Sequence, residues 1–399
     1  MTTPTELSMP GLSATVPTPR IRAVVTDSLV VEVLKGPQGT LFGKNTSAGV
    51  INIVSEAPSF TPGFEGEATA GNYGAFGAAL SVTGGLTDQV AGRLYIGQRE
   101  REGFYNVTVP SGGPRTETDD QNQNFWTARG QLLILPSDAA SIRLIADYSK
   151  RDEYCCVASQ VITGPTGAII NALTPGGTGI RGPISPNYAA STPLPFSRDV
   201  YANRGTEQYI EDMGLSAEAN IDLPSMNATL TSITAWRDWE SVNGSDVDFS
   251  GADLFYRDDD GAFSFALEQL SQEVRLAGST DTVDWLIGGI FSNEDLQRND
   301  SFLFGAGANA YFSALFANAA GVPARAGTFL NCISSATPIQ VAPGVFVPAN
   351  LICASQGFVA PLAPGLTIAS GSGYQDRYAQ NSDSFAVFTN NTWRVTEQL

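Results

Sequence analysis

The amino-acid sequence predicts a mainly β protein whose strands form part of an antiparallel transmembrane β-barrel. Three observations support this fold class. Apolar and polar side chains alternate along many segments, short turns alternate with long loops, and the composition is poor in charge but rich in glycine and aromatic residues. Together these features are typical of barrels that cross a membrane with strands.

The composition favours strands and tight turns. Of the 399 residues, 42% are hydrophobic but only 16% are charged, while 41 are glycine and 10% are aromatic. Such a balance suits an aromatic belt at the borders of a membrane. No run of about 18 apolar residues occurs, so the sequence predicts no transmembrane helix.

The charge balance excludes several classes of function. The net charge is −18 and the chain contains no histidine. A surface of this sign would repel the phosphates of nucleic acid, so we exclude nucleic-acid binding. A Ser-His-Asp triad and a histidine-rich zinc site are both excluded as well.

Alternation with a period of two is clear between residues 141 and 149. Ile142, Leu144 and Tyr148 share one face, and Arg143 and Asp147 share the other. This period indicates a strand with one polar face. By the same template we predict about ten strands, near residues 64–72, 75–84, 89–103, 122–136, 140–152, 206–222, 226–243, 263–278, 282–296 and 383–395.

The alternation also predicts which side chains face the interior of the barrel. The polar set comprises Arg143, Asp147, Glu218, Asn220, Glu273 and Arg275. The set expected to face lipid comprises Ile142, Leu144, Leu215, Ile221, Val274, Leu276 and Trp285. A register error of one residue would invert a whole strand.

The connections differ systematically in length. Short turns fall at residues 84–88, 136–139, 223–225 and 279–281, and long loops at about 104–121, 153–205, 244–262 and 297–382. Outer-membrane barrels have short turns at one rim and long loops at the other. We therefore expect the four turns to cluster at one rim and the loops to project from the opposite rim.

Residues 31–54 read VEVLKGPQGTLFGKNTSAGVINIV. This run resembles the plug domain of TonB-dependent outer-membrane receptors, which carries a strand, a Gly-Pro-x-x-x-Leu-x-Gly turn and a Gly-x-Ile-Asn-Ile strand leading to the barrel. We assign the matching residues a structural role, because glycine and proline permit the tight turns of a compact plug. They are Gly36, Pro37, Gly39, Thr40, Leu41, Gly43, Gly49 and Asn52.

The resemblance implies a function without bond chemistry. Receptors of this family take up scarce nutrients, such as iron–siderophore complexes, across the outer membrane, and the TonB–ExbB–ExbD complex of the inner membrane supplies the energy. It implies a small-molecule ligand, contact with outer-membrane lipid, no cofactor, no metal site of the protein itself and no catalytic residue. The chain is thus expected not to be an enzyme.

The resemblance also implies a domain division. Residues 1–60 correspond to the C-terminal part of a plug, and residues 61–399 to the N-terminal part of a barrel. A family barrel has about 22 strands, so we expect a truncated receptor. The first residues lack the basic start and apolar core of a signal peptide, and no segment there fits the TonB-contacting box.

The loop over residues 297–382 offers candidate ligand contacts. Tyr311, Phe312 and Phe316 lie at helical spacing, which favours a short helix there. These rings are candidates for a wall that receives an apolar or aromatic ligand. The competing interpretation is that they pack the loop against its neighbours.

Four cysteines lie in predicted loops. Cys155 and Cys156 are adjacent, and Cys332 and Cys353 share the 297–382 loop. An even number suits an oxidising compartment and two disulfides. The sequence leaves open whether each pair bonds internally or across the two loops.

Residues 246–251 resemble the start of a calcium loop, but the twelfth position, where a bidentate glutamate belongs, is Arg257. We therefore expect a solvated loop there.

Two other functions are alternatives to transport: a surface ligand-binding or adhesion protein, and a secreted β-rich hydrolase with paired carboxylates. The Gly-Pro turn ahead of the strands favours the receptor over both.

Overall fold

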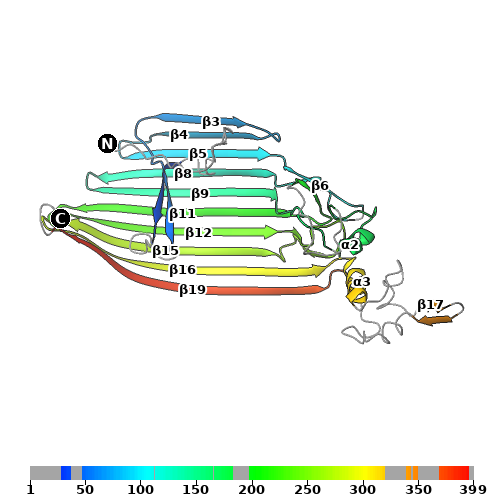
Figure 1. Ribbon diagram of the computed structural model, residues 1–399. Helices are drawn as coiled ribbons and strands as arrows, with labels where there is room; N and C mark the ends of the chain where they lie inside the picture. The colour runs from blue at the N-terminus through cyan, green and yellow to red at the C-terminus, as the bar shows by residue number, and fades with distance from the viewer. Residues whose placement is uncertain are drawn as a thin grey trace.

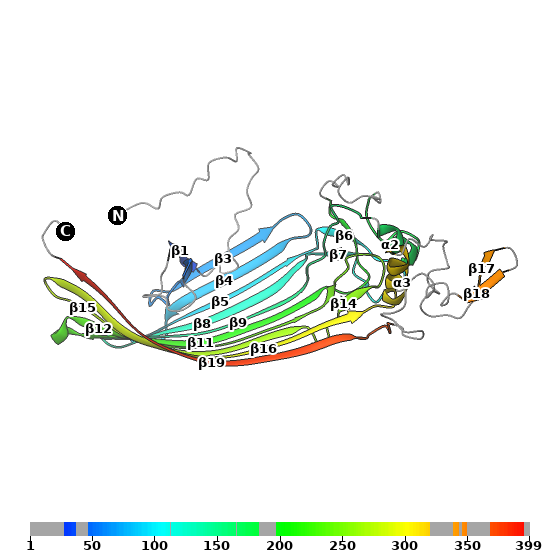
Figure 2. The same cartoon turned by 60° about the horizontal axis from the view of Figure 1, so that its bottom comes forward.

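The computed structural model describes residues 28–36, 47–111, 113–164, 166–182, 197–319, 338–342, 345–348 and 368–394. Its main element is one twelve-stranded sheet, which is bent and carries a two-stranded hairpin over one of its faces (Figures 1 and 2). The long strands of the sheet pair with their neighbours in antiparallel fashion. The expected fold class is confirmed.

All ten expected strands are present, each next to its neighbour in sequence among the long strands. They are β3 (Gly63–Ala70), β4 (Phe76–Gly85), β5 (Val90–Arg101), β8 (Gln123–Ser137), β9 (Ala140–Tyr154), β11 (Glu207–Leu223), β12 (Ala228–Asn243), β15 (Ser264–Ser279), β16 (Val283–Phe304) and β19 (Gly373–Trp393). The short strands β13 (Ser245–Asp246) and β14 (Phe255–Arg257) complete the sheet beside β16.

Two strands are longer than the alternation predicted. β16 continues to Phe304, and β19 begins at Gly373 rather than near residue 383. The added residues include the directly paired Asp300 and Asp376, which lie on strand ends that both carry polar side chains. Because this extension is polar on both faces, it lacks the apolar alternation by which strands are recognised. The connection between these strands is accordingly shorter than expected.

The predicted rims are confirmed. The four short turns lie together at one end of the sheet (left in Figure 1), where the 3-10 turn Pro224–Met226 is one of them. The helices α2 (Gly167–Leu173) and α3 (Ala308–Ala319), which belong to the two longest loops, lie at the opposite end. We call these ends the turn rim and the loop rim.

The register confirms the predicted faces. Residues directly opposite each other in an antiparallel pair share a face. Arg143 pairs with Glu218, while its neighbour Leu144 pairs with Ala217 on the other face. Arg143 also donates to the carbonyl of Ser55, the last residue of β2, which fixes its face as the inner one. We call the face that carries Arg143 the interior face and the opposite one the outward face.

The hairpin on the interior face consists of β1 (Ser28–Lys35) and β2 (Gly49–Ser55), paired antiparallel. Gly49 has a φ of 149°, and a Cβ atom at this position would lie 2.6 Å from the carbonyl oxygen of Leu34. A larger residue would therefore separate the two strands at their closed end. The backbone N–H of Gly36 donates to the carbonyl of Ala48 across the same end.

The loop rim carries a packed cap. Strands β6 (Tyr105–Thr108), β7 (Asp119–Asp120) and β10 (Asp199–Tyr201) form a small sheet, in which β10 runs parallel to β6. Val107, Val157, Val200 and Ala202 form a small core beneath it, and Ile170, Ala252 and Leu254 form a second core beside α2.

Strands β17 (Pro338–Ala342) and β18 (Val345–Pro348) pair with each other. No helix among the described residues has the length and apolar character needed to cross a membrane.

Candidate functional site

The segment that follows β2 is docked on the interior face of the sheet. Nη2 of Arg93 donates to Oε2 of Glu56 at 2.7 Å, and Nη2 of Arg143 donates to the carbonyl of Ser55 at 3.1 Å. Nε2 of Gln131 donates to the carbonyl of Glu56 at 3.1 Å. These donors come from three adjacent strands, β5, β8 and β9, so the segment is held by side chains and not by strand pairing.

The same segment continues toward the turn rim. The backbone N–H of Ser59 donates to Oγ1 of Thr83 at 2.8 Å, and the N–H of Gly85 donates to the carbonyl of Phe60 at 3.1 Å. Sequence reasoning named Arg143 as an interior residue but missed the docking contacts of Arg93 and Gln131. The only signal in the sequence was that Arg93 and Gln131 occupy interior-facing positions in the alternation of β5 and β8.

Above these contacts, the middle of the interior face holds a charged layer. Arg237 of β12 forms an ion pair with Asp147 of β9 at 3.1 Å and a second one with Asp212 of β11. The next layer toward the loop rim is apolar where Trp239, Leu267 and Leu296 stand opposite one another. Polar and apolar layers thus succeed each other up the interior face.

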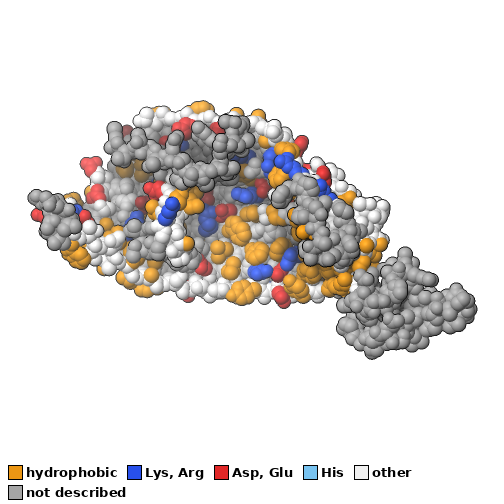
Figure 3. All heavy atoms as spheres, in the orientation of Figure 1, with side chains coloured by type: hydrophobic (Ala, Val, Ile, Leu, Met, Phe, Trp, Pro, Cys, Tyr) orange, Lys and Arg blue, Asp and Glu red, His pale blue; other side chains and the backbone are white. Residues whose placement is uncertain are grey.

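The next layer toward the loop rim is a cross-strand row that we call the mouth row. Over eight adjacent strands it holds three arginines, three aromatic residues, one isoleucine and one serine, and no acid. Its members, in strand order, are Arg99, Phe125, Arg151, Ile210, Ser241, Phe265, Arg298 and Tyr378. In the space-filling view, hydrophobic and basic side chains stand beside one another on this face (Figure 3).

The cap is fixed to the loop rim by a buried polar network. Arg115 and Asp120, whose side chains are fully buried, form an ion pair at 3.0 Å. Nη1 of Arg115 donates to Oγ1 of Thr206 at 2.8 Å, and the hydroxyl of Thr206 donates to Asp120. A buried charge pair of this kind is costly unless its hydrogen bonds are satisfied, and here the network joins the loop that holds Arg115 and Asp120 to Thr206, directly before β11.

The sequence that resembles a calcium loop is buried in the cap, so the expectation of a solvated loop was wrong. Asp246 is fully buried and accepts backbone N–H groups of Asn203 at 2.8 Å and Phe249 at 3.0 Å. Asp248 accepts the N–H groups of Leu254 at 3.1 Å and Phe255 at 2.9 Å. Both carboxylates organise the loop backbone. In the described part of the chain, no group of three or more acidic, cysteine or histidine side chains is placed to hold a metal ion.

Burial sets the protonation of these two carboxyls. Desolvation raises the pKa of Asp246 above its ordinary value, and the negative charge of Asp248 raises it further. Desolvation also raises the pKa of Asp248, although hydrogen bonds from Ser250 and neighbouring N–H groups oppose the shift. Both groups lie in the cap, at the far end of the strands.

The candidate aromatic contacts belong to α3, at the edge of the cap. The ring of Phe312 lies 5.8 Å from that of Phe255 and 6.1 Å from that of Phe304. Tyr311 packs against the core formed by Ile170, Ala252 and Leu254. In the structure these two rings contact neighbouring elements, as the competing interpretation expected. Phe316 lies in α3, and its side chain is outside the described residues.

The other candidate residues divide between described and undescribed parts. Gly36, Gly49 and Asn52 lie in or beside the β1–β2 hairpin, where Nδ2 of Asn52 donates to Glu32 at 2.9 Å. Cys155 and Cys156 form a disulfide with each other. Outside the described residues lie Pro37, Gly39, Thr40, Leu41, Gly43, Cys332 and Cys353.

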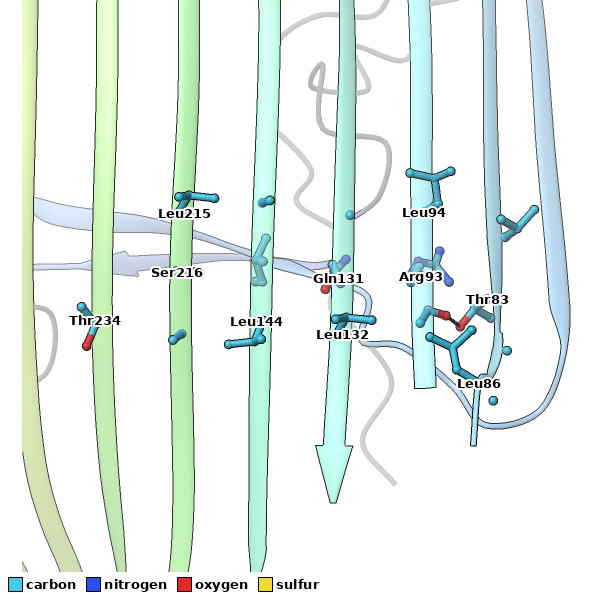
Figure 4. Close-up of a pocket in the computed structure, with 18 of the residues that line it drawn as sticks. Thr83, Leu86, Arg93, Leu94, Gln131, Leu132, Leu144, Leu215, Ser216 and Thr234 are labelled. Atoms are coloured by element: carbon cyan, nitrogen blue, oxygen red, sulfur yellow. Dashed lines mark hydrogen bonds between the residues drawn. The ribbon is translucent and has the colours of Figure 1, made fainter. Parts of the chain in front are cut away.

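A shallow hollow of about 890 Å³ lies on the outward face near the turn rim. Leu94, Leu132, Leu144 and Leu215 line it from four adjacent strands, as Figure 4 shows. The glycines and alanines between them, which include Gly130 and Ala146, leave the space open. Because this hollow is apolar and lies on the face expected to contact lipid, the interior face remains the candidate ligand face.

Comparison with known proteins identifies similar receptors, although no family model matches the chain. The ferrioxamine B receptor of Salmonella typhimurium is 41% identical over 66 residues, which are 16% of this chain and 9% of that protein. The pesticin receptor of Yersinia enterocolitica is 38% identical over 71 residues, which are 18% of this chain and 10% of that protein.

The fold agrees with the sequence similarity. The open form of the ferric-catecholate import receptor Fiu from E. coli K12 superposes with a TM-score of 0.53 and 15% identity. The match covers 92% of this chain and 47% of that structure, so the chain spans about half of the receptor it resembles.

Proposed function

We propose that this chain, which is a TonB-dependent outer-membrane receptor in its fold and in its matched sequence segment, takes part in the active uptake of an iron–siderophore or similar complex. The observation that carries the proposal is the docking of residues 55–60 on the interior face. A segment that enters the interior of a barrel and is held there by Arg93, Gln131 and Arg143 is what a plug requires.

The docking supports the domain division. Residues 1–60 act as the C-terminal part of a plug, and residues 61–399 as barrel strands with their loops. The outward face carries exposed apolar side chains such as Leu215, Val274 and Ile287, and it contacts lipid of the outer membrane. The ligand enters from the loop rim, where it first contacts the cap and the mouth row.

Transport requires an energy source outside the chain. The TonB–ExbB–ExbD complex acts on the plug from the turn rim. The small molecule passes through the barrel once the plug has moved. The interior face binds and orients a ligand without changing its bonds, so the protein is a transporter rather than an enzyme.

The test is uptake in cells that lack their own siderophore receptors and express the complete receptor containing this chain. We expect accumulation of radioactive iron from a ferric siderophore mixture, and we expect deletion of TonB to abolish it. Accumulation that persists without TonB would contradict the proposal. Ligand binding to cells without any accumulation would instead favour the surface-binding alternative.

A further inference from the structure

Gly130 lies in the middle of strand β8, although its backbone does not require a glycine. Its φ is outside the left-handed region, and a Cβ atom at this position would have no atom of the chain within 4 Å. At every other glycine in a described strand, at least one atom lies within that distance. Glycine weakens the interior of a strand, and it often marks a place where a ligand or another backbone comes close. No part of the described chain does so here, which indicates an occupant from outside it.

The open space at Gly130 is part of the hollow on the outward face, because Gly130 stands opposite Leu94 and Ala146. A second hollow of about 300 Å³ adjoins it toward the loop rim and shares Gly130 and Ala146 with it. We call the two hollows together the outward groove. It begins at Leu86, in the turn that follows β4 (Figure 4), and ends beside Tyr148.

The outward groove offers no charge to an occupant. Two charged residues border it, Arg93 and Asp147, and both have their partners on the interior face. Arg93 pairs with Glu56 at 2.7 Å, and Asp147 pairs with Arg237 at 3.1 Å. The groove itself presents the leucines of four strands, three of which are exposed, with glycines and alanines between them. A partner of this surface is therefore apolar where it touches the groove.

The size of the groove suits a hydrocarbon chain better than a protein surface. Its leucines stand on four adjacent strands, so the groove is about 14 Å wide. Along β8 it runs from Leu132 to Ala128, which is about 13 Å. This footprint of about 200 Å² is far below the roughly 800 Å² that each partner buries in a stable protein complex. The length is close to half of the hydrocarbon core of a bilayer, which is about 30 Å thick.

We propose that the outward groove is a binding site for a phospholipid of the leaflet at the turn rim, with one acyl chain lying over Gly130 between Leu94, Leu132, Leu144 and Leu215. The leaflet follows from the lower end of the groove, which opens at Leu86 on the turn rim. A chain in the groove touches walls as well as a floor, so it gains more dispersion contacts than a chain on a flat face. This inference rests on the proposed function, which places the outward face against lipid.

The experiment uses the complete receptor, purified in detergent and stripped of lipid, with palmitoyl-oleoyl phosphatidylethanolamine as the probe. Native mass spectrometry counts the phospholipids that each receptor retains. Gly130→Leu fills the open space with a side chain, so it should retain one phospholipid fewer than the parent receptor. Ala217→Leu, which fills the same groove from β11, should have the same effect and serves if the first variant does not fold.

A matched control lies on the same face outside the groove. Gly289 of β16 stands opposite Val274, and a Cβ atom there would meet only the carbonyl oxygen of Ala386, at 3.6 Å. Gly289→Leu adds the same side chain to the outward face and should leave the phospholipid count unchanged.

The Tm provides a second measurement, because a bound ligand stabilises the folded state. Without lipid, Gly130→Leu should melt at or above the Tm of the parent receptor. Added phospholipid should raise the Tm of the parent and of Gly289→Leu equally, and that of Gly130→Leu less. A merely structural role for Gly130 would instead lower the Tm without lipid and leave the phospholipid count unchanged, which would overturn the inference.

The remaining outcomes separate this inference from the proposed function. Equal phospholipid counts in all variants, equal losses in Gly130→Leu and Gly289→Leu, or a receptor dimer that only Gly130→Leu dissociates would each overturn the groove as a lipid site. TonB-dependent uptake alongside any of these results would leave the transport function standing. Uptake that does not depend on TonB would overturn the transport function, while a selective loss of phospholipid in Gly130→Leu would still support the groove.

Discussion

Arg93 and Glu56 form an ion pair at 2.7 Å between strand β5 and the segment that follows β2. The arginine side chain is 4% exposed and the glutamate side chain 38%. The barrel strand therefore supplies the buried partner, and the incoming segment supplies the accessible one. Together with Arg143 and Gln131, this pair fixes where residues 55–60 leave the interior of the sheet.

The docking contacts predict a defined loss when Arg143 is replaced. Arg143→Ala removes hydrogen bonds to Ser55, Glu56 and Gln131. A loss of about 2 kcal/mol would speed cleavage after Glu56 by a Glu-specific protease about thirtyfold. The measurement is the rate at which cleaved peptide appears by mass spectrometry.

The control for this variant is Arg275→Ala. Arg275 lies on the same interior face, but its ion pair is with Glu273 of its own strand, at 3.4 Å. Its removal should leave cleavage after Glu56 unchanged. Equal acceleration by both variants would show that loosening of the sheet, and not loss of docking, exposes the segment.

The assignment of faces predicts opposite tolerance at two adjacent residues of β11. Leu215 is 56% exposed on the outward face, whereas Ser216 lies on the interior face opposite Ile145. Leu215→Arg places a charge in lipid and should destabilise the receptor by about 2–4 kcal/mol. Ser216→Arg should cost much less, because the interior is polar.

Urea unfolding of the complete receptor in lipid vesicles measures this difference through the midpoint of the transition. A larger shift for Ser216→Arg than for Leu215→Arg would mean that the two faces are exchanged. Because register fixes the face of every residue on a strand, that result would invert β11 as a whole.

The buried carboxyls of the cap predict a dependence on pH. Burial raises the pKa of Asp248 to about 6 and that of Asp246 to about 8, against about 4 for an aspartate in the unfolded chain. The folded cap therefore binds protons more tightly than the unfolded cap. Its stability is greatest at low pH and falls as the pH rises from about 4 through 8.

Hydrogen exchange of the backbone N–H groups of Asn203 and Phe249 measures this effect, after correction for intrinsic exchange. Protection should decrease between pH 5 and 8 in the parent and change less in Asp246→Asn, which cannot ionise. Protection that increases over the same range would contradict the sign of the shift.

The open edges of the sheet predict the behaviour of this chain by itself. Within the described residues, β3 pairs only with β4 among the strands, and β19 only with β16. A strand in lipid must satisfy all its backbone groups by pairing, and the number of strands, their tilt and the barrel diameter are linked. The chain expressed with an added signal peptide should therefore not form a heat-resistant outer-membrane barrel.

The assay is migration on a denaturing gel with and without heating, since closed barrels resist unfolding in cold detergent. TonB-dependent uptake in cells that carry only this chain would show that the sheet closes on itself, and it would disprove the prediction.

Local pattern alone was sufficient for the strands that cross a membrane. Adjacent side chains of a strand face opposite sides, so the apolar Leu144 faces lipid and the polar Arg143 faces the interior. The difference in polarity between the two sides is therefore visible in neighbouring residues. The short turn at residues 223–225 and the long loop at 153–205 likewise revealed the two rims. The Gly-Pro turn after β1 predicted the receptor family, and the comparisons confirmed it.

Local pattern was not sufficient where both faces of a strand carry polar side chains. The loop ends of β16 and β19 carry polar residues on both sides, so no period of two is visible there and the pattern predicted a loop. Only the pairing of Asp300 with Asp376 and of Phe302 with Tyr374 shows that the strands continue.

The sequence by itself determined the strands, their faces, their rims and the kind of receptor, because each depends on contacts between near neighbours. Only the tertiary structure decided what lies together across strands. Arg99, Arg151 and Arg298 are far apart in the chain, yet register places them in one row. Glu56 meets Arg93 for the same reason: docking brings together side chains whose separation in sequence carries no periodic signal.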